Sequence, residues 1–193
     1  MIVSNSAGIT VSSNATLTVA NSAPSLVPVS NQTINAGMTL NVTNLATDID
    51  MPPQTLTFSL LTGPSNSLLN ANGVFNWRPS VSQAGTINPV SVVVTDNGTP
   101  NLSATNHFTV TVNALTSPTA GSPSYAGGQF SVSVGGQVGP DYYLQANTNL
   151  SGGAWTTVAT TNSPATTPII LTDPNAGSQL LQFYRIVTGP PSP

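Results

Sequence analysis

The residues of this chain that could carry chemistry are few, because its 193 residues include only 2 cationic and 5 acidic side chains and a single histidine. The cations are Arg78 and Arg185, and cysteine is absent. A hydrolytic triad needs a histidine beside a positioned serine and an acid, yet no Gly-x-Ser-x-Gly motif accompanies His107. The alternation of polar and apolar residues from Asn106 to Val110 instead predicts that His107 lies on a strand, at a surface or an edge.

The acidic residues are all aspartates, and three of them, Asp48, Asp50 and Asp96, fall in or beside predicted turns. Glycoside hydrolysis requires two carboxyl groups across a cleft, one with a raised pKa. Metal binding or turn formation explains the positions of these three aspartates better than catalysis does. Asp48-x-Asp50 puts two carboxylates on the same side of an extended segment, and Ca²⁺ takes six to eight oxygen ligands. We expect either a calcium site or turns in which these carboxylates accept backbone hydrogen bonds. No pattern indicates an enzyme.

The large aromatic residues are the remaining candidates for ligand binding, because an exposed ring can stack on a sugar. Trp77 alternates with Phe75, which predicts a place in a core. Trp155 begins another predicted strand, and we expect it in a core as well. Tyr142 and Tyr143 are neighbours on one strand and must point to opposite faces, so one of them is expected to be exposed and could contribute to a carbohydrate-binding face.

The composition limits the classes of partner. Charged residues make up 4% of the chain, against about 25% in an average soluble domain. The net charge of −3 leaves no basic surface for phosphate backbones, so we expect no nucleic-acid partner. No apolar run approaches the ~20 residues of a membrane span. Lysine, which commonly blocks sheet edges, is absent, so edge-to-edge association is lightly opposed.

Short alternating runs separated by turn signals predict an all-β protein. Residues 56–60 and 108–112 alternate clearly, whereas Asn72-Gly73 and the stretch from Asn97 to Pro100 are turn signals. We expect two immunoglobulin-like β-sandwich modules in tandem, preceded by an N-terminal hairpin. The predicted units are a hairpin over 1–20, a sandwich over 24–113, a Ser/Pro/Gly-rich linker over 114–127 and a small C-terminal sandwich over 128–189.

The N-terminal hairpin has no obvious partner, and a lone two-stranded hairpin is marginally stable in water. Its sequence, with Asn5-Ser-Ala-Gly8 as the turn, resembles the last two strands of a bacterial immunoglobulin-like domain. Three interpretations stay open. The chain is a fragment of a longer secreted protein, the hairpin packs on the following domain, or the hairpin is donated to a neighbouring molecule by strand addition.

Two stretches resemble known modules. Gly73-x-Phe75-x-Trp77-x-Pro79, followed by Gly85 and by Val92-x-Val94-Thr95-Asp96-x-Gly98, resembles the cadherin-like, dystroglycan-type immunoglobulin module of large bacterial surface proteins, over residues 24–113. The stretch from Tyr142 to Leu150, with Trp155, Asp173 and Phe183-Tyr184-Arg185, resembles a fibronectin type III-like module that closes large secreted bacterial proteins. The first resemblance implies that Asp48, Asp50 and Asp96 bind calcium at the junction with a preceding domain. The linker here, however, offers only Asn21 as a further oxygen donor.

Together these observations predict a non-catalytic extracellular structural protein, a component of a bacterial cell-surface or filament assembly that polymerises by strand donation from residues 1–20. The alternative is an adhesin or a carbohydrate-binding module of a larger secreted protein. Calcium is the one cofactor expected. The expected partners are further copies of the chain, or a surface protein or glycan.

Overall fold

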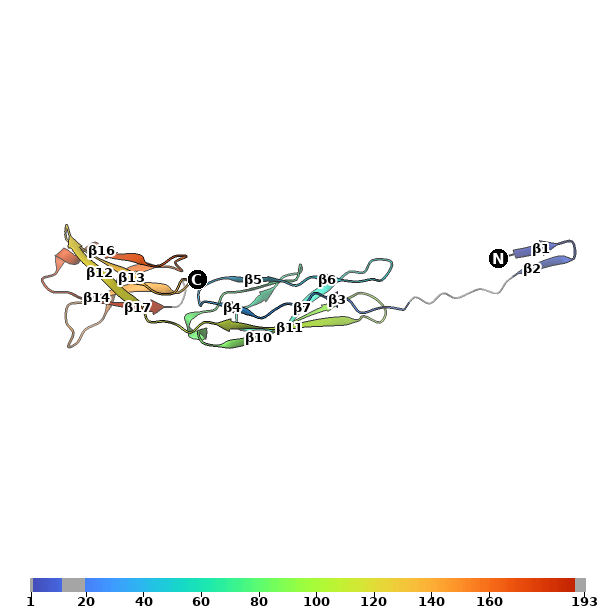
Figure 1. The fold of residues 1–193 in the computed structure, drawn as a ribbon, viewed down its shortest axis with the longest axis horizontal. Helices are drawn as coiled ribbons and strands as arrows, with labels where there is room; N and C mark the ends of the chain where they lie inside the picture. Colours follow the sequence, from blue (N-terminus) through green and yellow to red (C-terminus); the bar gives the residue numbers. More distant parts are fainter. Residues whose placement is uncertain (1, 12–19, 190–193) are drawn as a thin grey trace.

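Two β-sandwiches follow one another along the chain, and a separate hairpin precedes them (Figure 1). The computed structural model describes residues 2–11 and 20–189. Within these ranges the chain is built of strands and two short 3₁₀ turns, Val81–Gln83 and Ala176–Ser178. No helix in the described part is long and apolar enough to cross a membrane. The prediction of an all-β protein with tandem sandwiches is confirmed.

The first sandwich has a four-stranded sheet and a three-stranded sheet, with a short extra pair of strands. The four-stranded sheet has the order β4 (Gln32–Ile34), β11 (Ser103–Val112), β10 (Ile87–Thr95) and β7 (Thr57–Thr62). The three-stranded sheet has the order β5 (Leu40–Thr43), β9 (Val74–Trp77) and β8 (Leu68–Leu69), and the short pair is β3 (Ser25–Leu26) with β6 (Ala46–Thr47). All pairs are antiparallel except β4 with β11.

The core of this sandwich is filled by the inward residues of β9, β10 and β11. Phe75 and Trp77 are both completely buried, which confirms the prediction that Trp77 belongs to a core. The Phe75 ring meets the ring of Phe108 edge to face, with centroids 5.8 Å apart, a favoured geometry for aromatic pairs. The Trp77 indole N–H donates to the Ser65 carbonyl at 3.1 Å, so the buried polar atom of this ring is satisfied.

The second sandwich consists of two three-stranded sheets. One has the order β12 (Thr119–Ala126), β13 (Gln129–Gly135) and β16 (Ile169–Asp173), and the other β15 (Thr156–Thr161), β14 (Asp141–Asn147) and β17 (Phe183–Gly189). Their shared core contains five buried side chains: Val132, Val134, Tyr142, Leu144 and Leu171. The Tyr142 hydroxyl donates to the Gln137 carbonyl at 2.7 Å, whereas Tyr143, its neighbour, is only half-buried.

Two sequence expectations about this sandwich are wrong. The predicted linker 114–127 contains strand β12, which pairs with β13 from Thr119 to Ala126; backbone pairing overrode a composition typical of loops. Trp155 lies outside the core and is half-buried under the guanidinium of Arg185, whose Cζ is 4.5 Å from the ring centroid. A cation over the ring supplies the contact that a core would otherwise provide.

The two sandwiches meet end to end through a tight, polar junction. Gly37 and Gly139 both have positive φ angles, +80° and +109°, and a Cβ on Gly37 would overlap the carbonyl of Gly139. The Asn35 amide donates to the Val138 carbonyl at 3.1 Å. The Arg78 Nε donates to the Gly37 carbonyl at 2.8 Å, and the same guanidinium reaches the Ser163 hydroxyl in the second sandwich. The junction therefore depends on close backbone approach.

The N-terminal hairpin forms a sheet of its own. Strand β1 (Ile2–Asn5) pairs with β2 (Gly8–Val11), with Ile2 opposite Val11 and Ser4 opposite Ile9. Residues directly opposite each other share a face, so Ile2, Ile9 and Val11 lie on one face, and they are 69%, 71% and 66% exposed. The part of the predicted hairpin over residues 12–19 lies outside the described residues.

We predict that Gly37→Ala weakens the junction between the sandwiches. The added methyl would meet the Gly139 backbone, so we expect a loss of about 2 kcal/mol or more in unfolding free energy and a broader spread of inter-sandwich angles in small-angle X-ray scattering. Gly85→Ala is the matched control, because Gly85 has a similar φ of +76° and its Cβ would come no closer than 4.0 Å to a neighbour. Equal effects of the two substitutions on the scattering would contradict the prediction.

Candidate functional site

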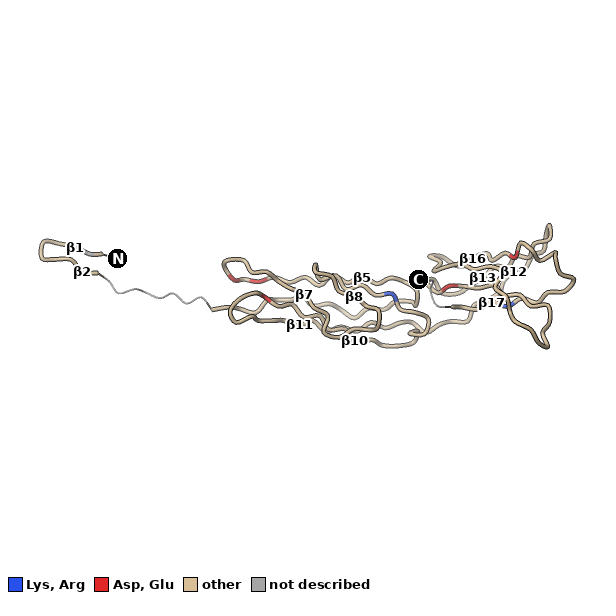
Figure 2. Tube along the Cα trace, turned by 180° about the vertical axis from the view of Figure 1, so that it is seen from behind, with Lys and Arg blue, Asp and Glu red and all other residues tan. Residues whose placement is uncertain are grey.

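The three predicted aspartates gather at the end of the first sandwich from which the N-terminal segment leaves (Figure 2). Three stretches meet there: the segment before β3, the loop between β6 and β7, and the loop between β10 and β11. Asn21 and Ser22 belong to the first, Asp48 and Asp50 to the second and Asp96 to the third. They converge because β7 pairs with β10 and β10 with β11, so the ends of these strands lie together.

Asp96 is the buried anchor of this end, with 2% of its surface exposed. One carboxylate oxygen, Oδ1, accepts hydrogen bonds from the backbone N–H groups of Gly98 and Leu102 at 3.0 and 2.9 Å. The other, Oδ2, accepts from the Asn21 amide at 3.1 Å. Burial alone would raise the pKa of Asp96, but the hydrogen bonds from Leu102, Gly98 and Asn21 outweigh it and hold the pKa below its usual value.

Asp50 is joined to Asp96 through two amide side chains. The Asp50 Oδ2 accepts from the backbone N–H of Ser22 at 2.8 Å and from the Gln54 amide at 3.0 Å. The same Gln54 nitrogen donates to the Asn21 Oδ1 at 2.5 Å, and Asn21 reaches Asp96. The order Asp96, Asn21, Gln54, Asp50 is therefore one continuous hydrogen-bonded row, which we call the Asp–amide row. It fastens the N-terminal segment to the sandwich.

Two buried oxygen atoms beside this row have no hydrogen-bond partner. Asp48 uses its Oδ1 to accept from the backbone N–H of Asp50 at 3.0 Å, which is the turn interaction that the alternative interpretation predicted. The Asp48 Oδ2 and the Gln54 Oε1, however, are buried and unpartnered. Buried acceptors of this kind are rare and require an explanation, such as water or an ion.

The row borders a cavity of about 340 Å³, whose lining includes Asn21, Asp50, Gln54 and Asn97. The described residues contain no group of three His, Cys, Asp or Glu side chains placed to hold one metal ion, so the three aspartates do not converge on a point by themselves. A hard cation prefers oxygen ligands of several kinds, including amide carbonyls. The Gln54 amide oxygen and the Asp50 carboxylate at this cavity are oxygen groups of this kind.

Sequence reasoning identified four members of this end but missed Gln54. The sequence points to Asp48, Asp50 and Asp96, and to Asn21 as an oxygen donor. The signal for Gln54 was its position, four residues after Asp50 in the same Pro-rich loop.

Gly98 leaves room for this row. A Cβ at this position would overlap the Asn21 amide, so a side chain there would push Asn21 away from Asp96.

His107 pairs with a serine on the neighbouring strand. It is exposed on β11, and its Nδ1 lies 2.9 Å from the Ser91 hydroxyl of the neighbouring strand β10. This is a cross-strand pair on the solvent face of the sheet. The prediction of a strand histidine at a surface is confirmed.

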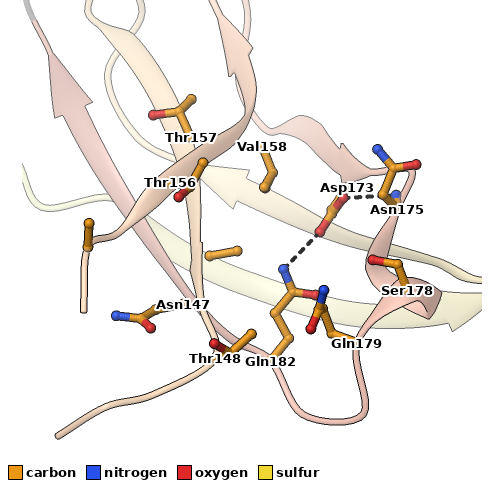
Figure 3. Close-up of a pocket in the computed structure, with 12 residues that line it drawn as sticks. Asn147, Thr148, Thr156, Thr157, Val158, Asp173, Asn175, Ser178, Gln179 and Gln182 are labelled. Carbon is orange, nitrogen blue, oxygen red and sulfur yellow. Dashed lines mark hydrogen bonds between the residues drawn. The ribbon is translucent and has the colours of Figure 1, made fainter. Parts of the chain in front are cut away.

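A second hollow, of about 440 Å³, lies in the second sandwich between the β14–β15 region and the turn before β17 (Figure 3). Amide and hydroxyl side chains dominate its lining, among them Asn147, Thr156 and Gln182. At its base the buried Asp173 accepts from the Gln182 amide at 3.3 Å and from the Tyr184 hydroxyl at 3.0 Å. Burial and the adjacent Asp173 raise the pKa of Tyr184, which keeps this hydroxyl a donor. The Gln182 Oε1 is buried without a partner.

Comparisons with known proteins give only distant likenesses. No protein-family model matches this chain, and no curated protein matches it in sequence. The chain is similar to a solved nucleoside hydrolase-related hypothetical protein from Saccharophagus degradans that is associated with carbohydrate metabolism, at 24% identity and a TM-score of 0.38, over 49% of this chain and 26% of that one. It is also similar to extracellular cadherin domains 3–6 of protocadherin gamma B2, at 13% identity and a TM-score of 0.40, over 87% of this chain and 52% of that one.

A third solved structure, the tandem Ig repeats of Dlar, matches at 12% identity and a TM-score of 0.29, over 89% of this chain and 94% of that one. The chain thus spans about a quarter of the length of the first of the three structures and about half of the length of the second. Since the TM-score of each of these three structures is below 0.5, their likenesses carry no argument about function. The fold stands on the strands of this chain, and the dystroglycan-type and fibronectin type III resemblances stay predictions.

We predict that Asp96 makes the stability of the protein depend on pH in the acid range. Its pKa is lowered on folding, so the unfolded state binds its proton more readily. The stabilisation is therefore complete above the ordinary pKa of 3.8 and is lost as the pH falls through the folded-state value. In denaturant unfolding between pH 2 and pH 7, Asp96→Asn should be less stable than the wild type at neutral pH and show a flatter acid profile. Parallel profiles would contradict this.

Proposed function

We propose that this chain is a non-catalytic structural module of an extracellular, cell-surface assembly. In this proposal the two sandwiches form a spacer, and the N-terminal hairpin joins one copy to the next. The observation that carries it is the hairpin itself, whose strands pair only with each other among the residues that the structure describes, and whose Ile2, Ile9 and Val11 are exposed on one face. A lone two-stranded hairpin is marginally stable in water, and an exposed apolar face of this kind typically marks an interaction site.

The junction between the sandwiches supports the role of a spacer. Gly37 and Gly139 bring two backbones into contact, and Arg78 and Asn35 bond across the seam. Such bonds fix the two sandwiches end to end (Figure 1), whereas a plain flexible linker would let them swing. A fixed angle transmits the position of one end of the module to the other, which is what a stalk or filament component requires.

The Asp–amide row supports a calcium site at the base of the N-terminal segment. The ion would be held by the carboxylate oxygens of Asp48 and Asp50 and the amide oxygens of Gln54 and Asn21. The cation would then be the partner that the buried Asp48 Oδ2 and Gln54 Oε1 otherwise lack. Because Ser22 is bonded to Asp50 and Asn21 to Asp96, an ion there would stiffen the point at which the N-terminal segment leaves the sandwich.

We predict that calcium stabilises the wild type against heat. A ligand that binds only the folded state adds about 2.7 kcal/mol at a concentration of 100 times its Kd, so the unfolding midpoint should be a few °C higher in calcium than in EGTA. Asp50→Asn should remove most of this difference. Asp173→Asn, in the second sandwich, is the control and should keep it. An equal midpoint in calcium and in EGTA for the wild type would rule out the calcium site.

We predict that the full chain self-associates and that the chain lacking residues 1–20 is a monomer. The reason is that removal of the hairpin removes the exposed face of Ile2, Ile9 and Val11 and leaves both sandwiches with their own sheets. Size-exclusion chromatography with light scattering, over a hundredfold range of concentration, measures this directly. Electron microscopy of the full chain then distinguishes closed oligomers from open filaments.

A second candidate function is glycan binding, and the polar hollow of the second sandwich favours it. Amides and hydroxyls around a buried carboxylate, with the Gln182 Oε1 unpartnered, match the hydroxyl groups of a sugar as donors and acceptors. If the full chain stays monomeric at every concentration but binds immobilised glycans, with loss on Asn147→Ala, this candidate replaces the structural one.

A further inference from the structure

We infer that the open side of the second sandwich, between β12 and β17, accepts the N-terminal hairpin of a second copy of this chain, one strand of which adds to the free edge of β17. The inference rests on the proposed function, because it names the surface on which the hairpin docks. It is carried by three features of the described residues: an unclosed side of the sandwich, an apolar groove in that side, and a strand edge suited to pairing.

The two sheets of the second sandwich have edge strands in contact on one side, and a ring stack of Phe130 on Tyr184 connects the sheets near the other side. Strands β15 and β16, at one edge of each sheet, lie next to each other. At the opposite edges, β12 pairs only with β13, and β17 pairs only with β14. The backbone groups on the outer edges of β12 and β17 are thus without a strand partner in the described part of the chain. An unpaired edge is a template for pairing with another chain.

The opening exposes the core of the sandwich as a groove of about 410 Å³. Val132 and Leu144, which belong to the core, line it, and the side chains of Phe130, Tyr184 and Ile186 complete its apolar surface. Leu144 is itself fully buried, so the groove reaches down to the core. A concave surface with apolar lining and free strand edges beside it is the arrangement that accepts an added strand.

The groove continues into a second hollow of about 400 Å³ toward the turn before β17. Phe130 and Tyr184, whose rings stack with centroids 4.0 Å apart, line both hollows. The second hollow is bordered by three large exposed side chains, Tyr125, Leu180 and Leu181, at 64%, 109% and 59% exposure. This apolar surface is continuous with the groove, and exposed apolar surface of this extent typically marks an interaction site.

Of the two free edges, β17 is the better template. Strand β12 contains Pro123, which has no N–H to donate, and its pairing with β13 shifts register between Gly121 and Ser124; both features hinder further pairing. Strand β17 pairs with β14 in one unbroken register from Phe183 to Gly189. No proline or register shift interrupts this edge, so a strand can add along it.

The hairpin has the complementary pattern. Ile2, Ile9 and Val11 project from one face of a two-stranded sheet, and when a strand adds to a sheet edge, alternate side chains enter the core side. The hairpin strands carry no charged side chain, and Arg185 is the one charged residue in the groove lining, so little charge must be desolvated. The N-terminal segment and the second sandwich leave from opposite ends of the first sandwich (Figure 1). Contact between such distant surfaces is heterologous, and it produces an open filament when the rotation does not close.

The test uses full-length variants in which aspartate replaces an exposed apolar side chain. Ile9→Asp changes the donor face, and Leu181→Asp and Ala120→Asp change the two hollows of the acceptor. Ile170→Asp is the matched control, because Ile170 is 64% exposed on β16, on the closed side of the same sandwich. In sedimentation velocity we expect at least tenfold weaker association for the donor and acceptor variants, and association like the wild type for the control. Circular dichroism checks that each variant is folded.

Disulfide trapping locates the contact independently, since the natural chain has no cysteine. A chain with Ile9→Cys is mixed with a chain with Ala120→Cys, which lies at the groove on β12. We expect a covalent heterodimer under mild oxidation, and none when the second chain carries His107→Cys on the exposed face of the first sandwich.

The outcomes separate this inference from the proposed function. If Ile9→Asp prevents association while Leu181→Asp and Ala120→Asp associate like the wild type, the groove is not the acceptor, although assembly through the hairpin stands. If none of the variants changes association, the hairpin itself is not the joint, and both proposals fall. A wild type that is monomeric at all concentrations has the same consequence.

Discussion

Burial of Phe75 and Trp77 between the sheets of the first sandwich is the interaction on which the rest of the structure depends. Their strand, β9, sets the register of β5, with Val42 opposite Phe75 and Leu40 opposite Trp77. Beyond Trp77 the chain continues directly into the junction, where the Pro79 carbonyl accepts from the Gly37 N–H at 2.7 Å. The position of the second sandwich is therefore tied to the core of the first by a few residues. Two fully buried aromatic rings bring several kcal/mol of hydrophobic stabilisation to this point.

The scarcity of charge shapes the surfaces of the molecule. Amide and hydroxyl side chains supply several of its polar contacts: Gln145 accepts from Arg185, Thr95 bonds to Ser103 across two strands, and Asn21 and Gln54 connect Asp96 with Asp50. Neutral groups are cheaper to remove from water than charges, so a surface of this kind opposes contact between copies less than a charged one does. This holds for the edge of β17 and for the hairpin face alike, and it connects the composition with the proposed assembly.

Much of the fold follows from local patterns, and the errors have identifiable causes. Strands such as β10 and β11 were predictable because apolar residues recur at alternate positions within them, as at Phe108, Val110 and Val112. Strand β12 was not, since all eight of its residues are exposed and it has no buried face to produce a pattern; only its pairing with β13 makes it a strand. Trp155 was misplaced because the sequence cannot show that Arg185, thirty residues later, covers its ring.

The sequence by itself determined the all-β class, the aromatic core of the first sandwich and the aspartates that end up in turns, because these depend on alternation and on side-chain chemistry within a few residues. The tertiary structure decided what lies next to what. It brought Asn21, Gln54, Asp50 and Asp96 into one row, left the Asp48 Oδ2 and the Gln54 Oε1 without partners, and opened the second sandwich between β12 and β17. Contacts between residues far apart in the chain depend on the packing of whole sheets, and no local pattern encodes that packing.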